Sequence, residues 1–152
     1  MAVVADVTVG VIRGDVEIAA SPGRVLQALT DPVELEQWWG ADDMYRTFDW
    51  RIDLRPGGAW SCQARNAGGE GSSVRGRYVT VDPPRVLEYT WQPSWDDFAE
   101  TLVRLELEPT DAGTRLRVTH TGFGDRADSC NGHAQGWTVV TGWLSEHAGM
   151  HP

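Results

Sequence analysis

The spacing of apolar residues changes period along this chain, and the order of those changes limits the fold more than any other feature. Residues 11–20 alternate between apolar and polar side chains, which is typical of a strand with one buried face. Residues 21–39 instead repeat their apolar side chains at helical spacing, with Ser21 as the predicted N-cap and Pro22 at the first helical position. A second proline, Pro32, divides this stretch into two short helices.

Alternation returns after residue 44 and continues through six further segments, which are separated by turns rich in glycine, proline and aspartate. The alternation predicts strands at residues 45–55, 60–64, 74–82, 85–92, 100–108 and 114–121. In the first of these, we expect the apolar side chains to face the core and the acidic side chains to face solvent. The expected core residues of that segment are Phe48, Trp50, Ile52 and Leu54, and the expected outer ones are Asp49 and Asp53.

The last part of the chain, residues 129–148, has a helical pattern with one apolar stripe that includes Trp137, Val140 and Leu144. A strand, two short helices, six strands and a long final helix make an α+β layout, because a one-sided antiparallel sheet must cover its apolar face. We therefore expect one domain over residues 1–152, with a seven-stranded antiparallel sheet and the long C-terminal helix packed across it.

The charge of the chain bears on its partners. It has 22 acidic and 13 basic residues, every basic one an arginine, and a net charge of −9. No basic cluster is visible in the sequence, so neither nucleic acid nor an anionic membrane is an expected partner. The chain shows no signal peptide and no apolar run of about 20 residues, and its two cysteines lie far apart. These features predict a soluble, cytoplasmic protein with free thiols.

Five blocks of the chain resemble one known family. The blocks, which run in the family's order from residue 16 to residue 147, are ALTDPVELEQWWG, DLRPGGAW, VDPPRVLEYTW, GTRLRVTHTGF and HAQGW. They resemble proteins similar to the activator of the heat-shock-protein-90 ATPase. That family belongs to the START-like (SRPBCC) helix-grip superfamily, with the birch-pollen allergen and the aromatic polyketide cyclases. The resemblance implies a curved antiparallel sheet that grips the C-terminal helix around an apolar pocket, and a link to chaperones and the stress response.

The chain is unusually rich in tryptophan, with eight in 152 residues. A buried indole removes roughly 150 to 250 Å² from water, worth about 4 to 6 kcal/mol, so filling the core alone could explain them. An empty pocket of about 300 Å³ would cost some 7 kcal/mol, so such a space must be filled or kept for a ligand. Both readings remain open, and the candidate ligand-binding residues are Trp39, Trp50, Trp60, Tyr89, Trp91, His120, Val140 and Trp143.

Two adjacent tryptophans end the second short helix, just before Gly40. Neighbours on a helix point about 100° apart, so Trp38 and Trp39 cannot face the same core. We expect Trp38 to pack with the helix and Trp39 to border the entrance of the pocket. The alternative is that both rings only seal the helix pair onto the sheet.

The sequence allows several interpretations of the histidines. His120 has the parity of an inward side chain, and can be either a satisfied core histidine or an acid, base or ligand-orienting group. His133 lies three residues after Cys130, but no second pair at zinc spacing accompanies them, so no metal is predicted. His147 and His151 are interpreted as incidental residues at a frayed end.

The function we expect first is binding of an unidentified hydrophobic small molecule between the sheet and the C-terminal helix, with no cofactor and no assigned catalytic residue. One alternative is a cyclase- or hydrolase-like enzyme that uses the same cavity, with His120 and Tyr89 as proton-transfer groups. Another is a chaperone-regulating interaction module that acts through its surface. A homodimer is compatible with the sequence.

Overall fold

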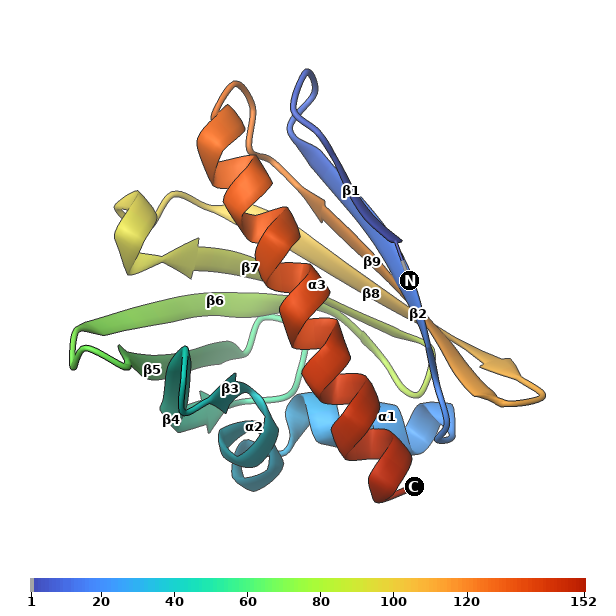
Figure 1. Ribbon diagram of the computed structural model, residues 1–152. Helices are drawn as coiled ribbons and strands as arrows, with labels where there is room; N and C mark the ends of the chain where they lie inside the picture. Colours follow the sequence, from blue (N-terminus) through green and yellow to red (C-terminus); the bar gives the residue numbers. More distant parts are fainter. Residues whose placement is uncertain (1) are drawn as a thin grey trace.

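The computed structural model describes residues 2–152 and is built on one antiparallel sheet that curves around a long helix (Figure 1). The strand order is β1-β2-β9-β8-β7-β6-β5-β4-β3. The strands are β1 (Ala2–Asp6), β2 (Val11–Ile18), β3 (Gly40–Ala41), β4 (Tyr45–Ile52), β5 (Ala59–Asn66), β6 (Gly71–Asp82), β7 (Val86–Pro93), β8 (Thr101–Thr110) and β9 (Gly113–Thr121). The helices are α1 (Pro22–Thr30), α2 (Pro32–Trp38), the short 3-10 helix η1 (Ser94–Asp96) and α3 (Ala127–Met150).

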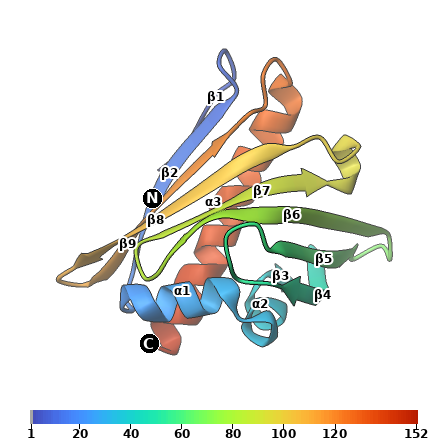
Figure 2. The same cartoon turned by 180° about the vertical axis from the view of Figure 1, so that it is seen from behind.

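All helices of regular length lie on one side of the sheet. Helix α3 runs diagonally across the concave inner face, and α1 and α2 lie at one end of it (Figure 1). The view from behind shows that no helix crosses the outer face (Figure 2). The α+β class and the long C-terminal helix expected from the sequence are therefore confirmed.

Residues 2–152 form nine strands, so the expectation of seven strands was wrong. The seven expected strands are present as β2 and β4 to β9, and the two additional ones lie at the edges of the sheet. Strand β1 pairs only with β2, and its sequence lacks the alternation that a half-buried strand needs. Strand β3 has only two residues, too few for a period to show.

Helix α1 begins at the predicted N-cap Ser21, and α2 has an equivalent cap in Asp31. The Ser21 side chain accepts a hydrogen bond from the Arg24 backbone N–H at 3.3 Å, and Asp31 accepts one from Val33 at 2.9 Å. The two helices are tied together by Trp38, whose indole N–H donates to the Ala28 carbonyl at 2.9 Å. They thus form one compact unit over the end of the sheet.

Strand β4 contains a β-bulge that reverses the direction of its side chains. The register between β4 and β5 shifts between Phe48 and Arg51, and Asp49 has a φ of +52°. Phe48 therefore lies on the outer side, where the Arg65 guanidinium sits 5.7 Å from its ring. The expectation that Phe48 faces the core was wrong, because one extra residue inverts the alternation; Trp50, beyond the bulge, points inward as expected and is half-buried.

The end of the same segment also departs from the alternation. Leu54 follows the last residue of β4 and is 40% exposed, so its expected place in the core was wrong. Ile52 does face inward. Asp53 is exposed as expected, and Asp53 and Asp49 pair with Arg55 at 2.9 Å and with Arg51 at 3.2 Å.

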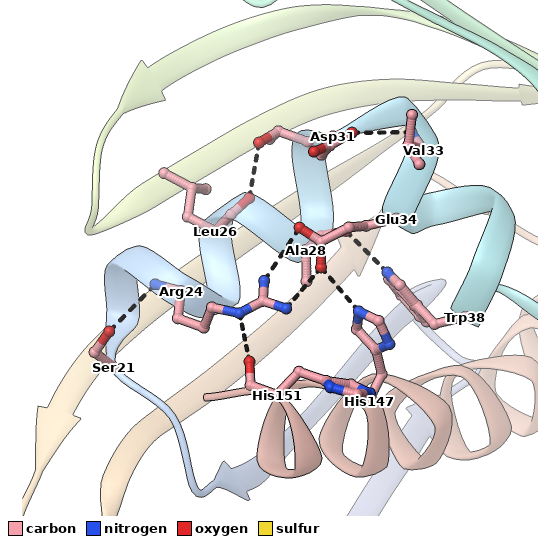
Figure 3. Close-up of polar contacts among 11 residues, drawn as sticks. Ser21, Arg24, Leu26, Ala28, Asp31, Val33, Glu34, Trp38, His147 and His151 are labelled. Carbon is pink, nitrogen blue, oxygen red and sulfur yellow. Dashed lines mark hydrogen bonds and ion pairs between the residues drawn. The ribbon is translucent and has the colours of Figure 1, made fainter.

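The C-terminal end of α3 is held against α1 and α2 by one carboxylate (Figure 3). Glu34 accepts two hydrogen bonds from the Arg24 guanidinium, at 2.7 and 3.2 Å, and lies 2.8 Å from Nε2 of His147. The Arg24 Nε donates to the backbone carbonyl of His151 at 2.5 Å. The His147 imidazole therefore belongs to a tertiary contact and not to a frayed end, whereas His151 takes part only through its backbone carbonyl.

Burial raises the pKa of Glu34, but the hydrogen bonds and charges of Arg24 and His147 outweigh it, so the net pKa is lowered. The ionised carboxylate is the form that the fold stabilises. The contribution of Glu34 to the free energy of unfolding is therefore fully present above the carboxyl pKa of the unfolded chain. It is lost as the pH falls through the lower pKa of the folded protein.

We predict that Glu34→Ala lowers the free energy of unfolding at pH 7 by about 1 to 3 kcal/mol, because the Arg24 guanidinium loses its carboxylate in a largely buried place. Urea denaturation followed by circular dichroism measures the loss. Glu36→Ala, an exposed glutamate on the same helix, is the control and should change stability by less than about 0.5 kcal/mol. Equal losses in the two variants, or a loss that does not shrink below pH 4, would contradict this account.

Candidate functional site

A small apolar cavity lies between the inner face of the sheet and the helices α1 and α2. Its volume is about 20 Å³, room for about one water molecule. No charged side chain lines it. The lining residues are Leu29 of α1, Leu35 of α2, Trp39 directly after it, and Trp50, Ile52, Trp60, Tyr78, Leu87, Tyr89, Trp91 and Leu105 from β4 to β8.

Four of the lining residues form a connected group of indoles. Trp39 lies 5.5 Å from Trp50 and 6.3 Å from Trp91, measured between ring centroids, and its ring is nearly parallel to that of Trp91. Trp60 completes the group, at 6.2 Å from Trp50 and 5.7 Å from Trp91. Such ring pairs contribute stabilisation beyond their buried area, so the four indoles support one another in this wall.

A glycine on the neighbouring strand makes room for Trp60. Gly76 pairs with Trp60 across β5 and β6, and a Cβ atom there would lie 2.5 Å from Nε1 of Trp60 and closer still to the Thr90 carbonyl oxygen. The indole therefore crosses β6, and its N–H donates to the Thr90 carbonyl at 3.2 Å. The Arg77 backbone N–H bonds the Thr90 hydroxyl at 2.8 Å in place of a backbone carbonyl. A side-chain indole thus replaces part of the ladder between β6 and β7.

The two adjacent tryptophans at the end of α2 have different roles. Trp38 turns toward α1, and Trp39 turns into the indole group. Trp39 is only 8% exposed, so it lies within the cavity wall. The half-buried lining residues are Trp50 and Ile52 on β4, which mark the side of the cavity nearest to solvent.

The structure brings five of the eight candidate ligand-binding residues together around this cavity: Trp39, Trp50, Trp60, Tyr89 and Trp91. The other three lie elsewhere. His120 and Val140 are buried in the core, and Trp143 is half-buried on α3 with its ring edge-to-face on Tyr45 at 5.7 Å. The cavity lies under α1 and α2, and α3 contributes no residue to its lining.

Six lining residues were not among the sequence candidates: Leu29, Leu35, Ile52, Tyr78, Leu87 and Leu105. The register of the sheet is the signal that would have found Tyr78, since it pairs directly with Tyr89 across β6 and β7. Burial raises the pKa of both phenols, so both are neutral hydrogen-bond donors. Within residues 2–152, neither hydroxyl has a hydrogen-bonding partner. Both residues belong to the lining of the cavity.

His120 is a fully buried histidine with both ring nitrogens engaged. Its Nδ1 accepts a hydrogen bond from the Trp137 indole at 3.0 Å, so the proton of the neutral ring lies on Nε2. Nε2 lies 2.7 Å from the Thr101 hydroxyl, which in turn donates to the Trp91 carbonyl at 3.3 Å. Of the two interpretations, the geometry favours the satisfied core histidine, which holds α3 to β8 and β9.

Ser129, His133 and Asp96 also come together, but their hydrogen bonds do not make a nucleophile. The Ser129 hydroxyl donates to Asp96 at 2.5 Å, and the His133 Nδ1 lies 2.8 Å from the backbone carbonyl of Ser129. The other ring nitrogen of His133 accepts from the Trp91 indole at 3.1 Å. Nδ1 therefore carries the proton of the neutral ring and cannot act as a base toward the Ser129 hydroxyl, which lies 3.4 Å from it. The cluster anchors η1 to the start of α3.

No three His, Cys, Asp or Glu side chains gather as a metal site would require in the part of the chain that the structure describes. Nor does any helix within that part have the length and apolar character needed to cross a bilayer. The two cysteines, Cys62 and Cys130, are buried and free. Burial raises the pKa of Cys62 to about 12, so this thiol stays protonated and unreactive.

A long helix in a curved antiparallel sheet, with a small apolar cavity under two short helices, defines a helix-grip protein of the START-like class. The model of the family called activator of Hsp90 ATPase homolog 1-like protein matches residues 19–149, and the chain belongs to this family. The resemblance seen in the sequence is thereby confirmed. The comparison with curated proteins found no match.

Solved structures share this fold across their whole length. The AHSA1 protein from Silicibacter pomeroyi is 28% identical, with a TM-score of 0.80 over 93% of this chain and 99% of that one. A protein from Arthrobacter aurescens is 20% identical, with a TM-score of 0.84 over 99% and 92% of the two chains. A protein from Mycobacterium smegmatis is 22% identical, with a TM-score of 0.83 over 96% and 94%. The last two likenesses concern the fold alone.

The buried histidine makes stability depend on pH. Burial, and then the nearby His133, lower the pKa of His120 well below its ordinary value of 6.5. The unfolded ring takes up a proton below pH 6.5, and the folded ring does not. The contribution of the neutral His120 ring to the free energy of unfolding is therefore complete above pH 6.5 and is lost as the pH falls below it. We predict that His120→Gln reduces the slope of unfolding free energy against pH, between pH 6 and 5, by about 1.4 kcal/mol per unit.

Denaturation with urea at a series of pH values measures this slope. The control is Val118→Ala, which removes buried volume from the same face of β9 without removing a titrating group. It should lower stability by a similar amount at every pH. A variant at His120 with the slope of the parent protein would show that the imidazole does not hold its neutral state in the fold.

Proposed function

We propose that the protein binds a small, largely apolar molecule in the cavity lined by the indole group. The observation that carries this proposal is the convergence of eleven side chains on one space, six of them aromatic and none charged. Apolar pockets with a few directed polar groups are the usual form of a small-molecule site. The two phenol hydroxyls of Tyr78 and Tyr89 supply those polar groups.

A guest larger than water must move part of the wall, because the cavity itself measures only about 20 Å³. The strands are held by hydrogen-bonded neighbours on both sides and resist displacement. Leu29 and Leu35 lie instead on the two short helices, which are fixed by side-chain contacts such as the Glu34 carboxylate. We infer that α1 and α2 shift outward as a unit when the guest enters.

The chemistry of the wall sets the class of the guest. A charged group would lose its hydration without gaining an ionic partner, which excludes it energetically from this place. A flat ring system would fit between the indoles, and one oxygen acceptor would satisfy the hydroxyl of Tyr78 or Tyr89. The expected guest is therefore a neutral, flat, mostly hydrocarbon molecule that carries a carbonyl or a similar acceptor.

Binding fits the geometry better than the two alternative functions. A cyclase- or hydrolase-like reaction would need an acid or base at the cavity, but the lining contains no carboxylate or imidazole and both nitrogens of His120 are engaged. A surface module would present one apolar patch. The exposed large apolar side chains instead come from different helices, strands and loops along the chain: Val4, Val9, Val33, Met44, Leu54, Val79, Trp95 and Met150.

The proposal extends to the cellular compartment and the biological role of this binding. The free, buried Cys62 and Cys130 are compatible with a reducing compartment, which supports the cytoplasm. The family name links some members to a chaperone ATPase. A role in the stress response would follow for this chain if its guest or its partner were produced under stress.

The cavity can be blocked at its solvent side. We predict that the neutral fluorescent probe N-phenyl-1-naphthylamine binds with enhanced emission, and that Ile52→Trp abolishes the enhancement because a larger ring fills the half-buried entrance. The matched control is Val79→Trp, which adds the same ring to an exposed position on β6 and should leave binding unchanged. Equal binding to both folded variants, or none to the parent protein, would reject the cavity as the site.

The two phenols can be tested with a pair of guests that differ in one oxygen. We predict that 2-acetylnaphthalene binds more tightly than 2-ethylnaphthalene, because its carbonyl accepts a hydrogen bond from a tyrosine. Tyr89→Phe, or Tyr78→Phe, should weaken binding of the ketone by about fivefold, as expected for the loss of one neutral hydrogen bond. Binding of the hydrocarbon should stay unchanged. Fluorescence titration of the tryptophans measures both constants. The same loss for both guests would mean that the hydroxyls only shape the wall.

A further inference from the structure

A depression on the outer face of the sheet contrasts with the apolar cavity on the inner face, because its lining is polar and positively charged. It is open to solvent, measures about 380 Å³ and is formed by the outer faces of β4 to β7, the face that no helix crosses (Figure 2). Three arginines stand around it, and small side chains make up much of its floor. The lining residues are Arg51, Ala59, Trp60, Ser61, Arg75, Gly76, Arg77 and Gln92.

The register of the strands explains why these residues meet. Arg51 pairs with Ser61, and Ser61 pairs with Arg75, so the two arginines flank a small residue on the strand between them. Neighbouring strands are about 4.8 Å apart, which places their α-carbons about 10 Å from each other. Arg77 lies two residues after Arg75 on the same face and pairs with Ala59. Long cationic side chains around short ones make a hollow.

Two of these arginines differ from most others in the chain. Arg24, Arg46, Arg51, Arg55, Arg85, Arg104, Arg115, Arg117 and Arg126 each lie within 4 Å of a carboxylate. Arg75 and Arg77 have no such partner among residues 2–152. This is unexpected in a protein with a net charge of −9, where acidic residues are abundant. The depression therefore carries positive charge that the protein itself does not neutralise.

Both guanidinium groups are nevertheless held in place. The Arg75 guanidinium lies over the Phe98 ring at 4.0 Å, and Arg77 donates to the Gly57 carbonyl at 3.1 Å. Arg51 lies 3.2 Å from Asp49, an exposed contact that an incoming anion can replace at little cost. Cations that are positioned by contacts other than ion pairs lose less freedom when they bind an anion.

We propose that this depression binds a small organic phosphate. Guanidinium groups bind phosphate oxygens through paired, charge-assisted hydrogen bonds, and three arginines on two strands, β4 and β6, can together contact several oxygens of one phosphate group. A volume of about 380 Å³ has the size of a small-molecule site. The rest of the surface repels long polyanions, because the chain as a whole is strongly acidic.

Isothermal titration of the parent protein with pyrophosphate and with fructose 1,6-bisphosphate tests the proposal. We expect saturable binding at low salt that weakens as the salt concentration is raised to about 0.2 M. Arg75→Ala and Arg77→Ala should each weaken binding about tenfold, as expected for the loss of a charge-assisted pair. Arg115→Ala and Arg117→Ala, two ion-paired arginines of β9, should leave binding unchanged.

Other outcomes would overturn the proposal. They are the absence of saturable binding to the folded protein, equal losses in the β6 and β9 variants, tighter binding of citrate than of either phosphate, or binding of polyglutamate alone. Arg75→Lys guards against a folding defect, because it keeps the charge but not the paired geometry. This variant should bind more weakly than the parent protein and more tightly than Arg75→Ala, and binding equal to that of the parent protein would overturn the role of the paired guanidinium geometry.

Discussion

The concave face of the curved sheet must be filled, and the way it is filled governs the rest of the structure. Helix α3 packs mainly against β1 and β2, whereas α2 packs against β4. The part of the inner face between α3 and α2 is occupied by the indoles of β4, β5 and β7. By the measured cost of about 24 cal/mol per Å³, the remaining 20 Å³ destabilises the fold by only about 0.5 kcal/mol. The tryptophans have thus filled most of a space that would otherwise cost several kcal/mol.

The sequence predicts the elements well where apolar residues keep a regular period over many positions. This is why β2, β4 to β9 and α3 were found near their true positions. Strand β3 was not predicted because two residues carry no period, and Phe48 of β4 was assigned to the wrong face because a bulge at Asp49 inverts the alternation there. An aspartate in an alternating segment gives no sign that its φ will be positive, so register and bulges had to come from the structure.

The same reasoning explains how much of the candidate site could be predicted. Parity tells which side chains point inward, and Trp60 and Trp91 were identified on that basis. It does not tell which part of the inner face they reach. His120 and Val140 are buried as expected but lie away from the cavity, His120 on β9 and Val140 on α3 itself, because their place depends on how the helix crosses the sheet. The contribution of α1 and α2 to the wall is tertiary and has no local signal.

The two candidate sites arise from one alternation of side chains and share one indole. On β5, Trp60 points inward and Ser61 outward, and on β6, Gly76 lies between the outward Arg75 and Arg77. The apolar cavity and the cationic depression are therefore the two faces of the same pair of strands. Trp60 belongs to the lining of both, and the missing side chain at position 76 leaves the room in which its indole reaches the Thr90 carbonyl. A larger residue there would displace the indole and part β6 from β7, so a single glycine holds both faces in their present form.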